Sequence, residues 1–197
     1  MKRLAAGTTN LHKVHEIRSA LAALTGWTVE ALPPGAPDVE ETGSTFLENA
    51  IQKALHFSRH VDALTLADDS GLYIDALGGR PGIQSARYAG DAQSRIERVL
   101  GEMESVADEQ RGAKFVCALA LARAGNLIWT VERDVYGRIA RTPSGTRGFG
   151  YDPIFYLPEL GRTMAELTTE EKEKVSHRGR ALAELGRFLE QSGAWCV

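Results

Sequence analysis

Ala63 to Gly71 reads Ala-Leu-Thr-Leu-Ala-Asp-Asp-Ser-Gly, a short apolar run followed at once by two carboxylates. The run predicts a buried strand over 63–67 that ends abruptly at Asp68. Functional sites of α/β proteins gather at strand ends, so this acidic end is a candidate site. Adjacent strand residues point to opposite faces, so Asp68 and Asp69 are not expected to form a dyad; one should face the site while the other braces the following loop. The alternative is an ordinary turn, because Asp, Ser and Gly favour turns.

Patterns on both sides of this stretch predict a mixed α/β fold, with helices early and late and long strands between them. Strands are expected over 3–7, 28–32, 114–123 and 126–140, with the last two antiparallel and joined near Gly125. Helices are expected over 10–25, 45–57, 92–104 and 177–191. The segments 33–43, 78–90 and 142–152 are rich in proline or glycine and are expected to be loops.

Composition narrows the class of protein further. The chain has 197 residues, and its 23 Lys and Arg against 26 Asp and Glu give a formal net charge of -3. No global basic field exists to hold a nucleic-acid polymer. No apolar run approaches the roughly 18–20 residues that a membrane span needs. Cys117 and Cys196 lie far apart, which argues against a disulfide framework and for a reducing cytoplasm.

Basic residues stand where helix starts usually carry acidic ones. Asn10 is a plausible N-cap followed by Lys13, and Ser176 is a plausible N-cap followed by His177 and Arg178. Either these side chains curl into water, or they join the free N–H groups and the helix dipole in binding phosphate. Lys53 falls on the apolar seam of the helix expected over 45–57, where it either snorkels or points its ammonium into a cleft.

Hard oxygen ligands beside separate lysines and arginines fit Mg²⁺ with a polyphosphate, because Mg²⁺ takes few carboxylates and keeps water and phosphate ligands. The acidic loop at 38–41 is either a further source of oxygen ligands or simply solvated. No P-loop motif is present, which excludes a standard P-loop NTPase. The histidine pairs at 12 and 15 and at 56 and 60 lack a third ligand and are expected on the surface.

The segment 147–153 interleaves glycines with Phe149 and Tyr151. It is interpreted either as a hairpin tip with incidental aromatics, or as a platform that stacks a base while backbone groups contact its edge.

Motifs of this kind run along nearly the whole chain. In order they are Thr8-Thr9-Asn10-x-x-Lys13, Glu40-Glu41-Thr42-Gly43-x-Thr45-Phe46-x-Glu48-Asn49-Ala50-x-x-Lys53-Ala54, Ala67-Asp68-Asp69-Ser70-Gly71-Leu72, Gly78-Gly79-x-Pro81-Gly82-x-x-Ser85-Ala86-Arg87-Tyr88, Phe149-Gly150-Tyr151-Asp152-Pro153, Glu170-Glu171-Lys172 and Ser176-His177-Arg178. Together they resemble the HAM1-like inosine triphosphate pyrophosphatase family, the non-canonical purine NTP pyrophosphatases. His12 departs from the pattern, since relatives often carry glycine there.

The resemblance implies a hydrolase that converts ITP, dITP and XTP to the monophosphate and pyrophosphate and so cleanses the nucleotide pool. It implies an elongated mixed sheet flanked by helices, in two lobes with a central cleft, formed by a single domain over 1–197 without a separable linker. It also implies dependence on Mg²⁺ and a homodimer, and we expect the enzyme in the cytoplasm.

The resemblance also suggests roles for individual residues. Asp69 matches the family's proposed general base and is expected to ligate Mg²⁺ or orient its bound water for attack on the α-phosphorus. Glu40 is the expected second metal carboxylate, with Glu41 as the alternative. Lys172, His177 and Arg178 are candidate donors to the oxygen at C6 of the base. The full set of expected substrate-binding residues is Thr8, Thr9, Asn10, Lys13, Lys53, Ser70, Phe149, Gly150, Tyr151, Asp152, Lys172, His177 and Arg178.

Two other functions compete with this interpretation. One is a Maf-like pyrophosphatase that prefers modified pyrimidine nucleotides. The other is a nucleotide-binding module without catalysis, although such a module would not need the combination of Asp69, Glu40, Lys53 and Lys13.

Overall fold

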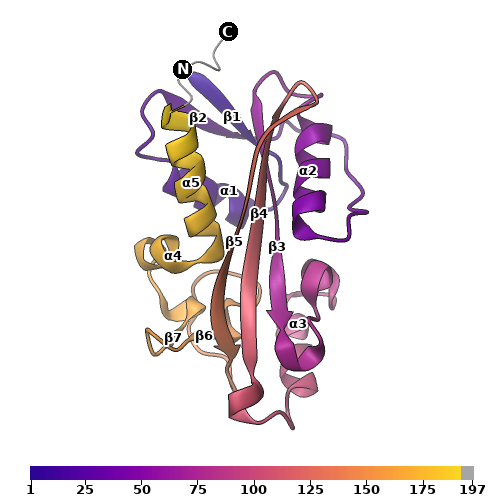
Figure 1. Cartoon of the computed structure of the whole chain (residues 1–197), viewed down its shortest axis with the longest axis vertical. Helices are drawn as coiled ribbons and strands as arrows, with labels where there is room; N and C mark the ends of the chain where they lie inside the picture. The colour runs from indigo at the N-terminus through magenta and orange to yellow at the C-terminus, as the bar shows by residue number, and fades with distance from the viewer. Residues whose placement is uncertain (192–197) are drawn as a thin grey trace. The chain divides into compact units, whose positions relative to one another are not determined.

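The computed structural model describes residues 1–191, and within them the fold is α/β with a mixed sheet in the order β2-β1-β3-β4-β5-β6-β7 (Figure 1). The strands are β1 Lys2–Ala6, β2 Trp27–Ala31, β3 Leu64–Ile74, β4 Gly112–Arg123, β5 Asn126–Ile139, β6 Phe155–Leu157 and β7 Arg162–Thr163. The helices are α1 Leu11–Ala20, α2 Phe46–Phe57, α3 Ala92–Glu102, α4 Thr169–Val175 and α5 His177–Gln191. β1 pairs in parallel with β2 and β3, whereas β6 is antiparallel to β5 and β7.

The chain divides into two compact units. Among the described residues, the first comprises Met1–Asp69, Cys117–Arg133 and 178–191, and the second comprises Ser70–Val116 and Asp134–His177. Each unit has its own hydrophobic core.

In the first unit, one sheet face is covered by α1 and α5. Its core combines alternate strand residues, such as Leu64 and Leu66 of β3, with Ile17 of α1 and Leu185 of α5. The period of two along a strand sends the residues between them to the opposite face. α2 lies on that opposite side, as Figure 1 shows, and it buries the stripe Phe46, Ala50, Lys53, Ala54 and Phe57.

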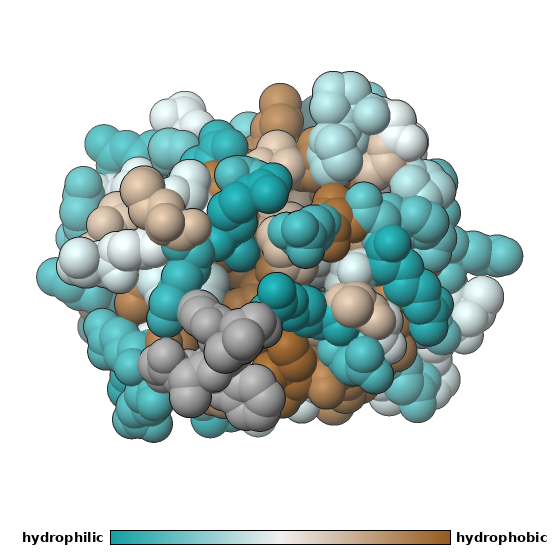
Figure 2. All heavy atoms as spheres, turned by 90° about the horizontal axis from the view of Figure 1, so that it is seen from above, coloured by the Kyte–Doolittle hydropathy of each residue, from teal (hydrophilic) through white to brown (hydrophobic). Residues whose placement is uncertain are grey.

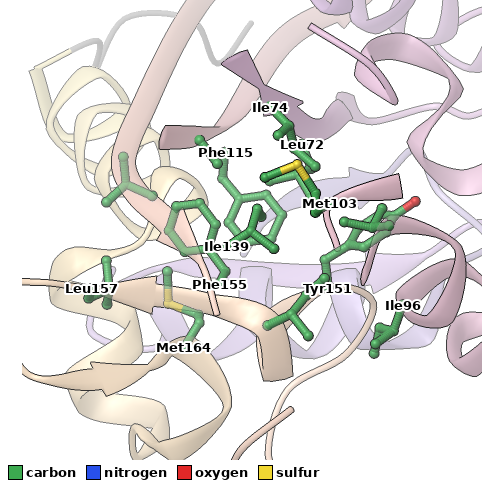
Figure 3. Packing of buried hydrophobic residues seen from close by; sticks show 14 of the residues in the cluster. Leu72, Ile74, Ile96, Met103, Phe115, Ile139, Tyr151, Phe155, Leu157 and Met164 are labelled. Atoms are coloured by element: carbon green, nitrogen blue, oxygen red, sulfur yellow. The ribbon is translucent and has the colours of Figure 1, made fainter. Parts of the chain in front are cut away.

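In the second unit, the core is built around aromatic rings. The ring centroids of Phe115 and Phe155 are 4.3 Å apart, and Figure 3 shows Tyr151, Met103 and Ile96 in the same cluster. Strand ends, 3₁₀ turns and α3 all contribute side chains to it. The short segments that carry Tyr151 and Met164 are therefore fixed by packing rather than by long regular elements.

Several predicted elements are confirmed. α5 spans the expected residues, α2 begins after the N-cap Thr45, and α3 begins at Ala92. β4 and β5 are adjacent and joined by Ala124 and Gly125, whose φ values of 49° and 78° give the two-residue turn that an antiparallel hairpin favours.

Other expectations are wrong. β3 does not end at Ala67 but continues to Ile74, so Asp68 and Asp69 lie within a strand and neither braces a loop. Buried neighbours on both faces sustain the strand through its turn-forming residues, a tertiary effect that outweighs local preference. α1 ends at Ala20 rather than at 25, because Ala22 and Leu24 donate to residues three positions earlier and tighten the chain into turns. α4, β6 and β7 were not expected.

The surface shown in Figure 2 is mainly hydrophilic, as expected for a chain in which 25% of the residues are charged. Hydrophilic residues cover most of the face shown in Figure 2, with hydrophobic atoms in smaller patches among them. Within residues 1–191, no helix has the length and hydropathy needed to cross a bilayer. Cys117 is buried and free, while Cys196 lies outside the described residues.

Candidate active site

Asp68 is enclosed by donors within the first unit, and its side chain is 0% exposed. Arg178 Nε donates to its Oδ2 at 3.0 Å, and Lys13 forms an ion pair with its Oδ1. Cys117 Sγ donates to Oδ2 at 3.1 Å. Arg178 also donates from Nη1 to Glu16 Oε2 at 2.6 Å. Burial acts to raise the pKa of Asp68, but Arg178 and Lys13 outweigh it and hold the pKa well below its usual value. Asp68 is therefore a charged anchor for two cations.

Asp69 belongs to a second group of side chains. Its Oδ1 accepts from Lys53 Nζ at 2.8 Å, and its Oδ2 accepts from Asn49 Nδ2 at 3.3 Å. Lys53 Nζ also donates to Glu41 Oε1 at 2.8 Å, so two carboxylates share one ammonium. Burial raises the pKa of Asp69, and Lys53 offsets this only in part. The pKa of Lys53 is lowered by burial but raised overall by its two acidic neighbours.

The two groups lie on opposite faces of β3, as the alternation of a strand requires. Asp68 continues the row of Leu64 and Leu66 toward α1 and α5, and Asp69 continues the row of Thr65 and Ala67 toward α2. This confirms that the aspartates do not form one dyad. Charge nevertheless links the groups, because Lys13 also acts to lower the pKa of Asp69. A raised carboxylate pKa suits a group that must accept a proton.

The first residues of α1 fit the predicted helix start. Asn10 is the N-cap, and its Oδ1 accepts from the N–H groups of His12 at 2.9 Å and Lys13 at 3.4 Å. The Asn10 N–H donates to Thr8 Oγ1 at 3.1 Å, while Thr9 is exposed. The side chain of Asn10 thus occupies two of the N–H groups that a phosphate would use. Phosphate binding by Thr8, Thr9 and Asn10 stays a prediction.

In the second unit, three predicted substrate-binding residues come together. Asp152 Oδ2 accepts from Lys172 Nζ at 2.7 Å and from the Phe149 N–H at 2.8 Å. Lys172 Nζ also lies 4.9 Å from the centroid of the Phe149 ring, within cation–π range. Gly148 has φ of +74°, and a Cβ there would collide with the Asp152 carboxylate. The turn therefore holds an aromatic face beside a buried ion pair.

The remaining predicted residues have separate surroundings. His177 is buried and its ring stacks on Phe115 with centroids 4.8 Å apart. Ser70 is half-buried on β3. The Arg178 side chain is only 3% exposed, beside Asp68 and Glu16, and its predicted contact with the base stays a prediction.

The carboxylates expected to bind metal differ in environment. Glu40 is exposed, whereas Glu41 reaches Lys53 and through it the vicinity of Asp69. Residues 1–191 contain no cluster of three or more His, Cys, Asp or Glu side chains arranged to hold a metal ion by themselves. His12, His15 and His60 are exposed, as expected, and His56 is half-buried.

Sequence reasoning missed three residues of these groups, namely Glu16, Asn49 and Cys117. Asn49 lies four residues before Lys53 on the same face of α2, so helical spacing was an available signal. Cys117 alternates with Leu119 and Leu121 and reads simply as core. Glu16 gave no signal, because its partner Arg178 lies 162 residues away in the sequence.

The protein is therefore of the α/β class, and two adjacent aspartates on one strand each pair with a lysine, Asp68 with Lys13 and Asp69 with Lys53. The model of the Ham1 family matches residues 4–188, and the chain belongs to this family. It is 51% identical over 196 residues to the dITP/XTP pyrophosphatase of Geobacillus kaustophilus, covering 97% of this chain and 96% of that protein. It is 49% identical over 195 residues to the dITP/XTP pyrophosphatase of Bacillus subtilis, with coverage of 96% and 98%.

Solved structures agree with this placement. A HAM1 protein from Coxiella burnetii superimposes with a TM-score of 0.87 at 41% identity, covering 98% of this chain and all (100%) of that one. The nucleoside-triphosphatase / dITP/XTP pyrophosphatase from Mycobacterium abscessus gives a TM-score of 0.72 at 43% identity, with coverage of 94% and 97%. The family resemblance and the α/β fold expected from the sequence are both confirmed.

Proposed function

We propose that this chain is a dITP/XTP pyrophosphatase that hydrolyses ITP, dITP and XTP to the nucleoside monophosphate and pyrophosphate. Family membership and full-length similarity to proteins of that name support the activity. The observation that carries the chemistry is the group of Asp69, Lys53 and Glu41, in which a buried carboxylate with a raised pKa lies 2.8 Å from a lysine.

Asp69 acts as the general base in this proposal. Its Oδ atoms take the proton of the water that attacks the α-phosphorus, and its raised pKa improves it as a proton acceptor near neutral pH. Lys53 neutralises charge that develops on the departing pyrophosphate. Asn49 fixes the orientation of the Asp69 carboxylate through its 3.3 Å hydrogen bond.

The donor set of this group fits Mg²⁺, since Asp69 and Glu41 offer hard oxygen ligands beside the same ammonium. Glu40 is the second ligand that the sequence favours, and Glu41, which shares the Lys53 ammonium with Asp69, is the alternative. Bound Mg²⁺ would supply charge neutralisation of the phosphates and a more acidic water.

The triphosphate and the base are assigned to different residues. Lys13, with Thr8, Thr9 and Asn10 at the start of α1, is proposed to contact phosphates, and Ser70 to contact substrate. The turn of Phe149, Gly150, Tyr151 and Asp152 is proposed as the stacking wall, with the Phe149 ring as its aromatic face. Lys172, His177 and Arg178 are proposed to select the oxygen at C6, Arg178 from its place beside Asp68 and Glu16. Fixed donors left unpaired by adenine can discriminate by roughly 10⁴–10⁵-fold.

We further propose that residues 1–197 act as one domain, that two copies form a homodimer, and that the enzyme works in the cytoplasm, where the free thiol of Cys117 stays reduced. Light scattering on the purified chain tests the dimer: a mass of one chain contradicts it.

The decisive experiment measures pyrophosphate release from ITP, dITP, XTP, ATP, GTP and modified pyrimidine triphosphates, with and without Mg²⁺. We expect turnover of the first three, lost on chelation and restored by Mg²⁺. Preference for the pyrimidines would favour the Maf-like alternative, and binding without release would favour a silent module.

Asp69→Asn tests the base directly. We expect a loss of about 10²–10⁴-fold in turnover of ITP, the usual contribution of a positioned general base. The matched control is Asp62→Asn, which makes the same change at an exposed position of the same unit and should keep wild-type turnover. Near-normal activity of Asp69→Asn would remove Asp69 from this role.

A further inference from the structure

The glycine-rich motif that ends in Ser85-Ala86-Arg87-Tyr88 has no part in the chemistry proposed above. In the second unit it folds into the 3₁₀ turn Gly82–Arg87 and packs against the end of β3. Pro81 forms a bridge with Tyr73, and the Gly79 N–H donates to the Ile74 carbonyl at 3.0 Å. The motif is thus fastened to the strand that carries Ser70.

Ser85 is the centre of this attachment. Its Oγ accepts from the Leu72 N–H at 2.8 Å and donates to the Gly82 carbonyl at 2.6 Å. Its own carbonyl accepts from the Tyr151 hydroxyl at 2.9 Å. Ser85 therefore bonds β3 through its side chain and the proposed stacking wall through its backbone.

The residues that make these hydrogen bonds are buried, so their polar groups cannot exchange these partners for water. Ser85 and Tyr151 are each 5% exposed, and Leu72 is 0% exposed. The Tyr151 ring lies in the hydrophobic cluster with Ile96 and Met103, as Figure 3 shows. Buried polar groups without partners are costly, so the Tyr151 hydroxyl has one well-defined place, and that place is the Ser85 carbonyl.

We propose that Ser85 and the hydroxyl of Tyr151 are positioning residues for the nucleobase, which hold the turn at 149–152 in register with β3. This inference rests on the proposed function and deepens it. Tyr151 lies between Gly150 and Asp152, whose carboxylate orients Phe149 and Lys172. Ser70 lies two residues before Leu72 on the same face of β3. Because Ser85 bonds both Leu72 of β3 and Tyr151 of the turn, it fixes the position of the stacking wall with respect to Ser70.

The test compares two inhibitors of ITP hydrolysis. Inosine monophosphate carries the base, whereas inorganic tripolyphosphate carries only phosphates. In Tyr151→Phe, which removes one hydroxyl, we expect the inhibition constant of inosine monophosphate to rise about three- to tenfold, the effect of one hydrogen bond. The constant for tripolyphosphate should change by less than about twofold, within the error expected for an uncoupled site.

Ser85→Ala and the double variant with Tyr151→Phe complete a double-mutant cycle. Ser85→Ala removes the bond to Leu72 and should weaken inosine monophosphate in the same selective way. The double variant should lose no more than the larger single loss, because both changes break one connection. Tyr136→Phe and Ser105→Ala are matched controls at exposed positions of the same unit and should behave as wild type.

Equal weakening of both inhibitors, no weakening of either, or single effects that multiply in the double variant would each overturn this inference while leaving the proposed function intact. A wild-type chain that releases no pyrophosphate from ITP, dITP or XTP would instead overturn the proposed function, and this inference with it.

Discussion

Asp68→Asn removes a negative charge from a side chain that is 0% exposed and paired with two cations. The asparagine oxygen can keep one hydrogen bond, but its NH₂ group then faces a cation. Arg178 retains Glu16 as a partner at 2.6 Å, whereas Lys13 loses the carboxylate it contacts. Removing one partner of a buried ion pair costs about 3–5 kcal/mol, and the surviving Glu16 contact places this case near the lower figure.

For a chain of this size, 1 kcal/mol corresponds to about 2–4 °C in Tm, so we expect a fall of about 6–12 °C at pH 7. The loss should depend on pH. The folded-state pKa of Asp68 lies below its ordinary value of 3.8, so its stabilisation is complete above that value and is lost as pH falls below it toward the folded pKa. The Tm values of wild type and Asp68→Asn should therefore approach each other in acid.

Asp69→Asn provides the matched control for stability. The folded-state pKa of Asp69 is raised from 3.8, so ionisation of this group opposes folding at pH 7, and Lys53 keeps Glu41 as a partner after the substitution. We expect a smaller loss of Tm from Asp69→Asn than from Asp68→Asn, because burial disfavours the Asp69 charge and Glu41 still pairs with Lys53. Urea unfolding and calorimetry, from pH 8 down to acid well below the ordinary pKa of 3.8, measure both variants. Equal losses in the two, or a loss in Asp68→Asn that persists unchanged in acid, would refute the reasoning.

Two further predictions concern activity and backbone geometry. Lys53→Met should raise the pKa of Asp69 further, since its nearest cation is lost, and a pH–rate profile for ITP should show the acidic limb moving to higher pH; an unmoved limb contradicts the pairing. Gly148→Ala should lose about 2 kcal/mol of stability in urea unfolding through strain at positive φ and collision with Asp152. Gly101→Ala, in an open position of α3, should instead gain about 0.5–1 kcal/mol. Equal effects of the two glycine substitutions would contradict the geometry.

The periodicity of the helices and strands predicted side-chain directions, and the order of the motifs predicted the family. The stripe of α2 predicted that Lys53 lies on its apolar seam, and alternation along β3 predicted that Asp68 and Asp69 face opposite ways. Both signals are local, because helix and strand geometry fix the direction of a side chain from its position alone. The motifs likewise placed the chain in its family before any contact was known.

Local signals failed where distant segments decide the outcome. Asp-Asp-Ser-Gly favours a turn, yet β3 continues through it to Ile74 because packing partners cover the strand. The partners of Asp68 come from α1, β4 and α5, which are far apart in the sequence and come together only in the folded chain.

The sequence by itself determined the family, through the order of its motifs, and the α/β class, through the periods of its helices and strands. Only the tertiary structure decided which charges meet. It assigned Arg178 to Asp68 and Glu16, gave Lys53 to both Asp69 and Glu41, and brought Ser85 to Tyr151. An ion pair or a buried hydrogen bond depends on distance and burial, and neither is encoded in the spacing of residues along the chain.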